Sequence, residues 1–276
     1  MSLLESVLYG FVSGITEFLP VSPRAHQALL RYILGVQTRD SMQNLLVHIG
    51  VFFAIILSSR EYLSRLHREQ KAISGSRRRR VRSSDAKSLY DLRLLKTATF
   101  PLVIGLLLSF PMGKLENSLL FIIIFLIFNG FVLLLAEHCS HGNRDSRTMT
   151  GLDGIVMGIV GALSSFPGIS RTGMITAYAT VRGADSQNAT NWAVLLGIPA
   201  LIFAACYDIV GIATSSIGVI TFPIIMGNLL SGAAAFAGGY LGISALRAVL
   251  NHSGFSSFAY YSLGEALLFF ILYLIT

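Results

Sequence analysis

An apolar segment that runs from residue 3 to residue 36 is interrupted near its centre by Glu17-Phe18-Leu19-Pro20-Val21-Ser22-Pro23-Arg24-Ala25-His26. Proline lacks a backbone N–H and clashes with the preceding helical turn, so it ends or kinks a helix. Ser22 is a favoured N-cap residue and Pro23 a favoured first helical residue, which predicts that a second helix begins at residue 23. The segment is therefore predicted to form a half-helix, an irregular tip and a second half-helix.

A second apolar segment, residues 152–183, is broken in the same way by Phe166-Pro167-Gly168-Ile169-Ser170-Arg171-Thr172-Gly173. Ser170 can cap a helix as Ser22 does. A helix–tip–helix unit can enter a bilayer and leave on the same side, provided that protein or a water-filled cavity satisfies its irregular backbone. Both segments, 3–36 and 152–183, are therefore predicted to be re-entrant hairpins.

The composition places these hairpins in a membrane. Of 276 residues, 53% are hydrophobic and 13% are charged, and the mean hydropathy is +0.67. An ordinary soluble domain has about 25% charged residues, so this chain cannot supply the polar shell of a water-soluble globule. The predicted fold class is an all-α integral membrane protein, which excludes a cytosolic enzyme and a free nucleic-acid binder. Six transmembrane helices, each long enough to cross about 30 Å of hydrocarbon, are predicted near 42–59, 95–112, 117–137, 189–211, 217–246 and 255–275.

The positive charge is concentrated in one segment. Between Arg60 and Lys96 lie 12 of the 21 Lys and Arg residues. Cytoplasmic loops of membrane proteins carry such an excess, so segment 60–96 is predicted to be a cytoplasmic loop that contacts anionic lipid head groups. Both chain ends are then outside, with Arg31 and Arg39 as external exceptions. The run Arg77–Arg80 is a weak nucleic-acid signal, and no nucleic-acid partner is predicted.

Residues recur at a constant offset of 147 positions, without a gap. The pairs are Gly14 and Gly161, Pro20 and Pro167, Arg24 and Arg171, Asn44 and Asn191, and Gly50 and Gly197. Each unit, 1–147 and 148–276, then holds one hairpin and three crossings, and an odd number of crossings inverts the second copy. The chain is predicted to be a single membrane domain of two inverted repeats, with a polar site where the broken helices meet. A shared bend explains the glycines and prolines, but it does not explain a costly cation at both tips.

Charged side chains at the two tips predict a diphosphate site. Helix N-termini carry unpaired N–H groups and the positive end of the helix dipole. The planar guanidinium groups of Arg24 and Arg171 suit a diphosphate held between them. Glu17 and His26 would lie beside it, where their side chains fit metal binding, general base work or attack on phosphorus. The simpler alternatives are that Glu17 only neutralises Arg24 and that His26 is an interfacial side chain.

Three further ionisable residues, His48, Asp208 and Glu265, lie in or near predicted membrane segments. Taken singly, each fits a pairing or helix-end role better than a ligand role. His48 lies in the crossing after the first hairpin, which makes it the strongest further candidate for the site.

The two tips resemble the signatures of the undecaprenyl-diphosphatase family, the bacitracin-resistance membrane phosphatases. The first signature is matched by Thr16-Glu17-Phe18-Leu19-Pro20-Val21-Ser22 with His26, and the second by Pro167-Gly168-Ile169-Ser170-Arg171-Thr172-Gly173. The resemblance covers essentially the whole chain. It implies a hydrolase of the bacterial cytoplasmic membrane whose site faces the outer side and which removes the terminal phosphate of undecaprenyl diphosphate, assisted by Mg²⁺ or Ca²⁺. The product is the lipid carrier that is recycled for peptidoglycan and cell-wall synthesis.

The resemblance, together with the chemistry of the tips, assigns the site residues. The predicted catalytic residues are Glu17, His26 and Arg171, and Glu17 is also the predicted metal ligand. The predicted diphosphate-binding residues are Ser22, Arg24, Ser170, Arg171, Thr172 and Thr176. The implied partners are a polyprenyl diphosphate and membrane lipids, and a homodimer is left open.

Four positions depart from the family pattern. Ser13 stands where an acid or Gln is usual, and Pro23, Arg24 and Ala25 stand where Ser, Thr and Gly are usual. The loss of a carboxylate and two hydroxyls weakens a Mg²⁺ or Ca²⁺ site, although Arg24 could partly stand in for the charge of the cation. The alternative to a phosphatase is therefore a catalytically altered binder or transporter of polyprenyl phosphates.

Overall fold

The computed structural model describes residues 1–36, 40–74, 86–112, 115, 118–139, 142–214, 221–252 and 254–275. Arg39 and the run Arg77–Arg80 lie outside the described residues. Within these ranges the chain is helical and forms no β-strand, which confirms the all-α prediction. The helices are α1 (Leu3–Phe18), α2 (Pro23–Ile33), α3 (Ser41–Ser58), α4 (Arg60–Ser74), α5 (Ala86–Leu106), α6 (Ser109–Met112), α7 (Leu119–Glu137), α8 (Gly151–Ala162), the 3₁₀ turn η2 (Leu163–Ser165), α9 (Arg171–Val181), α10 (Ser186–Leu195), α11 (Gly197–Thr214), α12 (Phe222–His252) and α13 (Ser256–Ile275).

Six segments are long and apolar enough to cross a membrane, and they overlap the six predicted crossings. They are Ser41–Ser58, Tyr90–Pro111, Leu119–Glu137, Ser186–Thr214, Phe222–Leu250 and Ser256–Ile275. Large apolar side chains also point outward: Phe100, Leu135 and Leu152 are each at least 70% exposed. Such a surface suits lipid rather than water, so the chain is a multi-pass membrane protein.

Two segments fold differently from the predictions. The predicted loop 60–96 contains helix α4, and helix α5 already begins at Ala86, because Arg, Lys and Glu are good helix formers outside the membrane. The predicted crossing 189–211 is built from two helices, α10 and α11, which meet at Leu196. Pro199 lies in the first turn of α11, where its missing N–H is tolerated.

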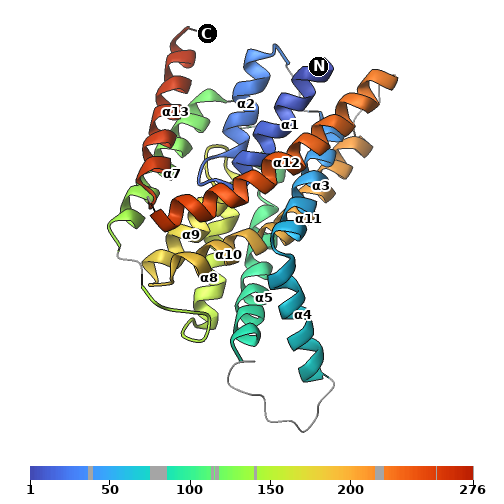
Figure 1. The fold of residues 1–276 in the computed structure, drawn as a ribbon. Coiled ribbons are helices and arrows are strands. Elements are labelled where there is room, and N and C mark those ends of the chain that lie inside the picture. Colours follow the sequence, from blue (N-terminus) through green and yellow to red (C-terminus); the bar gives the residue numbers. More distant parts are fainter. Residues whose placement is uncertain are drawn as a thin grey trace.

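Helices α1 and α2 form one hairpin, and α8 and α9 form the other (Figure 1). Helix α2 begins at Pro23 and α9 at Arg171, and the hydroxyls of Ser22 and Ser170 accept hydrogen bonds from the N–H groups of Ala25 and Gly173. The predicted caps are therefore confirmed. Both chain termini lie at one end of the molecule, and α4 lies at the other (Figure 1).

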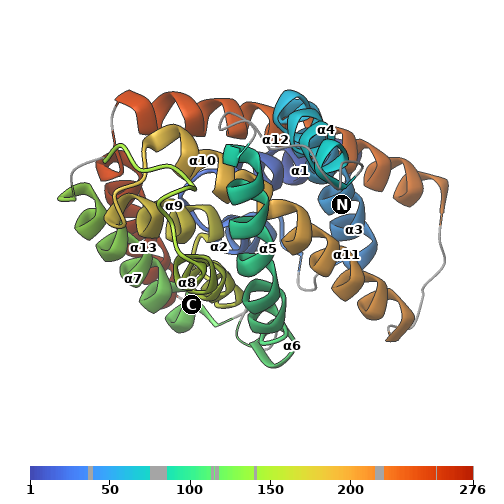
Figure 2. The ribbon, with the colours of Figure 1, turned by 90° about the horizontal axis from the view of Figure 1, so that it is seen from below.

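The tips of the two hairpins contact each other inside the molecule. The first tip is residues 17–24, and the second is residues 163–173. Gly168 N–H donates to Ser22 Oγ over 3.0 Å, and Ser170 Oγ donates to Leu19 O over 3.1 Å. Gly168 has φ +109°, a conformation that L side chains rarely adopt, and an added Cβ would lie 2.8 Å from Ile122 O. Viewed from below, α2 and α9 lie between α7 and α5 (Figure 2).

A buried amide on α7 fastens the two tips together. Asn129 Nδ2 lies 3.3 Å from Pro20 O in the first tip, and Asn129 Oδ1 accepts a 3.0 Å hydrogen bond from Ser170 N–H in the second. Nδ2 also contacts Ser262 Oγ of α13. The irregular backbone of both tips is therefore satisfied by protein groups, as a membrane interior requires.

Candidate active site

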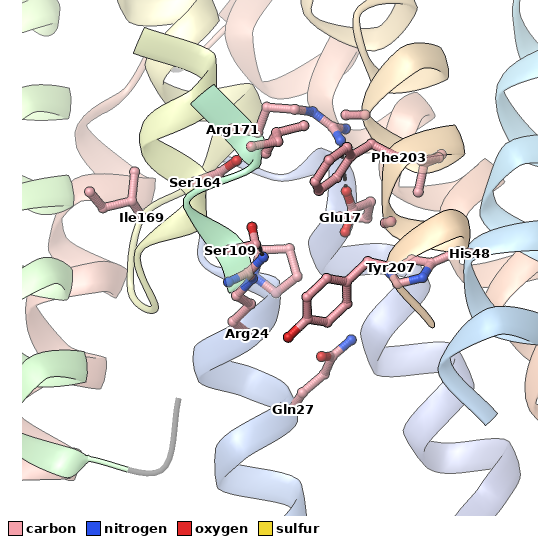
Figure 3. A pocket seen from close by; sticks show the side chains of 15 residues that line it. Glu17, Arg24, Gln27, His48, Ser109, Ser164, Ile169, Arg171, Phe203 and Tyr207 are labelled. Carbon is pink, nitrogen blue, oxygen red and sulfur yellow. Dashed lines mark hydrogen bonds and ion pairs between the residues drawn. The ribbon is translucent and has the colours of Figure 1, made fainter. Parts of the chain in front are cut away.

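A cavity of about 80 Å³, a volume large enough for several water molecules, lies beside the joined tips. Its walls come from segments far apart in sequence, and side chains of both hairpins reach it together with those of α3 and α11 (Figure 3). The polar side chains that line it include Glu17, Arg24, Gln27, His48, Arg171 and Tyr207.

Arg171 is the most deeply buried cation of this cavity. Its side chain is 7% exposed, and Nη1 donates to Glu17 Oε1 over 2.9 Å. Nε and Nη2 are buried and form no hydrogen bond with any described residue. Burying unsatisfied donors is costly, and a guanidinium with two unpartnered donor nitrogens fits a phosphate. This geometry indicates an anion site.

Arg24 brings a second guanidinium to the same cavity from the first tip. Its Nη1 donates to Ser165 O over 2.8 Å and its Nη2 to Ser109 Oγ over 3.0 Å. The first bond joins the first tip to the second, the other joins it to α6, and together they hold the guanidinium at the cavity wall. The prediction that guanidinium groups 147 positions apart reach one site is confirmed. The simpler alternative was that Glu17 only neutralises Arg24. In the structure the Glu17 carboxylate forms its ion pair with Arg171.

The hydroxyls predicted to bind the anion are used within the protein. Ser22 Oγ and Ser170 Oγ accept from helix N–H groups and connect the tips. Thr172 Oγ1 donates to Glu17 O, and Thr176 Oγ1 donates to Thr172 O. None of the four belongs to the described lining of the cavity. In this structure the four hydroxyls therefore bond to backbone groups of the tips and of α9.

His26 is also placed differently from the prediction. One turn into α2, its ring points toward α13, where Nε2 lies 2.7 Å from the hydroxyl of Tyr261 and the two rings stack. Nδ1 lies 2.8 Å from Ser22 O and 3.2 Å from Glu265 Oε1. We take the Ser22 contact as the hydrogen bond, because both carboxylate oxygens of Glu265 have no hydrogen-bond partner among the described residues. The structure therefore does not bring His26 to Glu17 and Arg171.

A different histidine occupies the cavity wall. His48 of α3 lines the cavity, and its Nδ1 lies 2.6 Å from Asp208 Oδ2 of α11. The sequence shows each of the two as an ionisable residue in an apolar helix. Such a residue is costly in a membrane unless it has a partner or a function. Their pairing could not be predicted from the sequence, because 160 positions separate them.

Ser13, which stands where the family usually has an acid or Gln, forms a hydrogen bond with the second helix of the hairpin. Ser13 Oγ of α1 accepts a 3.2 Å hydrogen bond from Gln27 Nε2 of α2, and Gln27 lines the cavity. A neutral amide and hydroxyl therefore stand beside the arginines.

Among the described residues that line the cavity, Glu17 provides the one carboxylate, so a Mg²⁺ or Ca²⁺ ion there would also need oxygen ligands from the substrate and from water. These cations need several oxygen ligands, carboxylates among them. The described residues contain no group of three His, Cys, Asp or Glu side chains that could hold a metal ion. The Glu17 carboxylate in the cavity wall is engaged by Arg171, and Arg24 brings a second positive charge to the same wall.

Comparisons with known proteins identify the same family that the sequence motifs of the two tips resemble. The sequence matches the family model described as bacitracin resistance protein BacA over residues 6–268. It is 28% identical over 269 residues to an undecaprenyl-diphosphatase of Alkaliphilus metalliredigens (strain QYMF), with 95% of each chain covered. It is 30% identical over 203 residues to undecaprenyl-diphosphatase 1 of Shouchella clausii (strain KSM-K16), covering 73% of this chain and 72% of that one. An undecaprenyl-diphosphatase of Synechococcus elongatus (strain ATCC 33912 / PCC 7942 / FACHB-805) is 31% identical over 230 residues, covering 80% and 78%.

Proposed function

This chain belongs to the bacitracin resistance protein BacA family, and we propose that it is an undecaprenyl-diphosphatase that hydrolyses the terminal phosphate of undecaprenyl diphosphate. Its relatives carry that name. The observation that carries the proposal is the buried guanidinium of Arg171, whose Nε and Nη2 have no described partner at a cavity shared with Arg24.

Charge stabilisation is the main task of the arginines in this reaction. A diphosphate brings several negative charges into a site of low dielectric constant, and more charge gathers on the leaving oxygen as the bridging P–O bond breaks. Fixed guanidinium groups stabilise that charge without reorganising. Glu17 orients Arg171 through the 2.9 Å ion pair and leaves Nε and Nη2 for the substrate.

An apolar groove beside the cavity suits the polyprenyl tail. It lies between α5 and α8, and its lining includes Gly105, Leu108 and Leu163. The next residues in the chain, Leu106, Ser109 and Ser164, line the cavity itself. A lipid whose head reaches the arginines can therefore lay its tail along the groove.

The placement in the membrane is part of the proposal. Both hairpins are re-entrant, and each belongs to one of two inverted repeats, residues 1–147 and 148–276. The chain ends and the site face the outer side of the bacterial cytoplasmic membrane, and segment 60–96 is cytoplasmic. The position of the termini opposite α4 supports this arrangement, as does the excess of Lys and Arg around α4.

The assay that tests the function measures phosphate release by the purified protein in detergent with undecaprenyl diphosphate. Release of one phosphate per lipid, with undecaprenyl monophosphate as the other product, is expected. A protein that binds the lipid without turnover would instead be a binder or transporter of polyprenyl phosphates.

Arg24 is expected to matter because it provides the second positive charge. Arg24→Gln should lower kcat/KM by about 10²-fold, since charge stabilisation by one fixed donor group is typically worth about this much. Arg147→Gln is the control, because Arg147 pairs with Asp145 in an exposed loop. Equal turnover in Arg24→Gln and the native chain would remove Arg24 from the site.

Gly197 leaves the space that Arg171 occupies. A Cβ at this position would lie 3.0 Å from Nη2 of Arg171 and 2.9 Å from Ile55 Cδ1. Gly197→Ala should displace the guanidinium and lower kcat/KM by about tenfold or more, because small misplacements of catalytic groups are costly. Gly264→Ala is the matched control, since an added methyl group there meets no atom within 4 Å. Full activity in Gly197→Ala would contradict the constraint.

A further inference from the structure

Helices α3 and α11 bring a histidine and an aspartate together inside the apolar part of the molecule. His48 Nδ1 lies 2.6 Å from Asp208 Oδ2, and the Asp208 side chain is fully buried. An ionisable pair inside membrane helices is costly and marks functional positions. The pair lies at the wall of the cavity, where His48 appears beside Tyr207 and faces the same space as Glu17 (Figure 3).

The hydrogen bond to Asp208 determines what the imidazole offers to the cavity. A neutral imidazole that donates from Nδ1 carries its lone pair on Nε2. No described residue forms a hydrogen bond with Nε2 of His48. A buried carboxylate on one ring nitrogen and a free acceptor on the other form the arrangement that prepares histidine for proton transfer.

We propose that His48 is the general base of this site and that Asp208 is the residue that positions it. The inference rests on the proposed function. His48 Nε2 takes a proton from a water molecule while the water oxygen forms a bond to the terminal phosphorus. The bridging P–O bond breaks, and its electron pair stays on the bridging oxygen of the polyprenyl monophosphate. Inorganic phosphate leaves, and the proton on His48 returns to solvent.

The other candidate bases are engaged elsewhere. The Glu17 carboxylate accepts from Arg171 at 2.9 Å, so a proton transferred to it would weaken the ion pair that holds the guanidinium. The His26 ring is bonded to Ser22 O and to Tyr261. His48 is thus the cavity histidine among the described lining residues.

Charged and titratable groups near His48 come from several helices. Asp208 and Tyr207 belong to α11, Glu17 to α1, Arg24 to α2 and Arg171 to α9. Helices α4 and α12 also pack against α3, but their charged groups, such as Glu61, Arg65 and Arg247, gather around Ser58 at its other end. The charged groups closest to His48 are therefore Asp208 and those of the cavity.

The test compares His48→Gln with His138→Gln in the phosphate-release assay with undecaprenyl diphosphate. His138 is an exposed residue at the C-terminal end of α7. His48→Gln should lower kcat by about 10²- to 10⁴-fold, the usual contribution of a general base, and His138→Gln should match the native chain.

Asp208 is tested by a separation of kinetic constants. Asp208→Asn should lower kcat by at least about tenfold and change KM by less than about threefold, since it acts on the base and not on the lipid. The double variant His48→Gln/Asp208→Asn retains a neutral hydrogen-bonding pair between the helices, so it reports on activity if a single variant does not fold. Imidazole added to His48→Ala should restore part of the lost turnover.

The outcomes separate the two proposals. Native turnover together with an unchanged rate in His48→Gln overturns the base role and leaves the phosphatase intact. Transfer of labelled terminal phosphate to the native protein, lost in His48→Gln, would show that His48 attacks phosphorus itself and would also overturn the base role. Lipid binding by the native chain without any hydrolysis would overturn both proposals.

Discussion

Replacing Arg171 with alanine is expected to lower kcat/KM for undecaprenyl diphosphate by at least about 10³-fold, which corresponds to about 4 kcal/mol of transition-state stabilisation. The change removes two unpartnered donor nitrogens, Nε and Nη2. It also leaves the Glu17 carboxylate without its 2.9 Å partner, so a negative charge then faces an anionic substrate. The measurement is steady-state phosphate release by purified protein in detergent.

Two further variants give this prediction its controls. Arg171→Lys keeps the charge but not the planar fork, so it should retain more activity than alanine and less than arginine. Arg147→Ala removes an exposed loop arginine paired with Asp145 and should leave turnover unchanged. Turnover by Arg171→Ala within threefold of the native value would show that the anion binds elsewhere.

Replacing Asn129 with leucine is expected to destabilise the protein most strongly among the substitutions considered. Leucine has the same branched side-chain shape, but it leaves Ser170 N–H and Pro20 O without the partners that Asn129 provides. Each unsatisfied buried group costs about 1–3 kcal/mol, so the free energy of unfolding should fall by about 3 kcal/mol. Turnover should fall as well, because the tips that carry Glu17 and Arg171 lose their common anchor.

The unfolding of detergent-solubilised protein measures this effect. Ser262→Ala removes one contact of Nδ2 and keeps both tip contacts, so its effect should be smaller. Asn143→Leu, at an exposed position, should leave stability unchanged. If Asn129→Leu unfolds at the native midpoint, other contacts alone hold the tips together.

Features governed by local chemistry could be predicted from the sequence. Ser22 followed by Pro23 starts a helix wherever it occurs, because the hydroxyl caps the first N–H groups and proline has none to cap. The six crossings could be predicted for a similar reason, since about 20 apolar residues are needed to cross a bilayer. The constant offset between Arg24 and Arg171 correctly indicated that both reach one cavity.

Features governed by side-chain direction could not be predicted in this way. His26 and Arg24 are two positions apart on α2, and a helix turns such neighbours to different sides. Which of them faces the cavity depends on α13, whose Tyr261 binds the ring of His26. The tip hydroxyls were assigned to the ligand because a sequence does not show which backbone groups a bend leaves unpaired. The partner of His48 was hidden for the same reason, since only the packing of α3 against α11 reveals it.

The bonds between the tips bear on how this molecule can work. A carrier that exposes its site alternately to the two sides of a membrane must slide or rock one half against the other. Here such a stroke would break the Gly168–Ser22 and Ser170–Leu19 hydrogen bonds and the Arg171–Glu17 ion pair in every cycle. These contacts between the tips favour a site that stays fixed while the lipid diffuses to it, over a site that moves relative to the membrane.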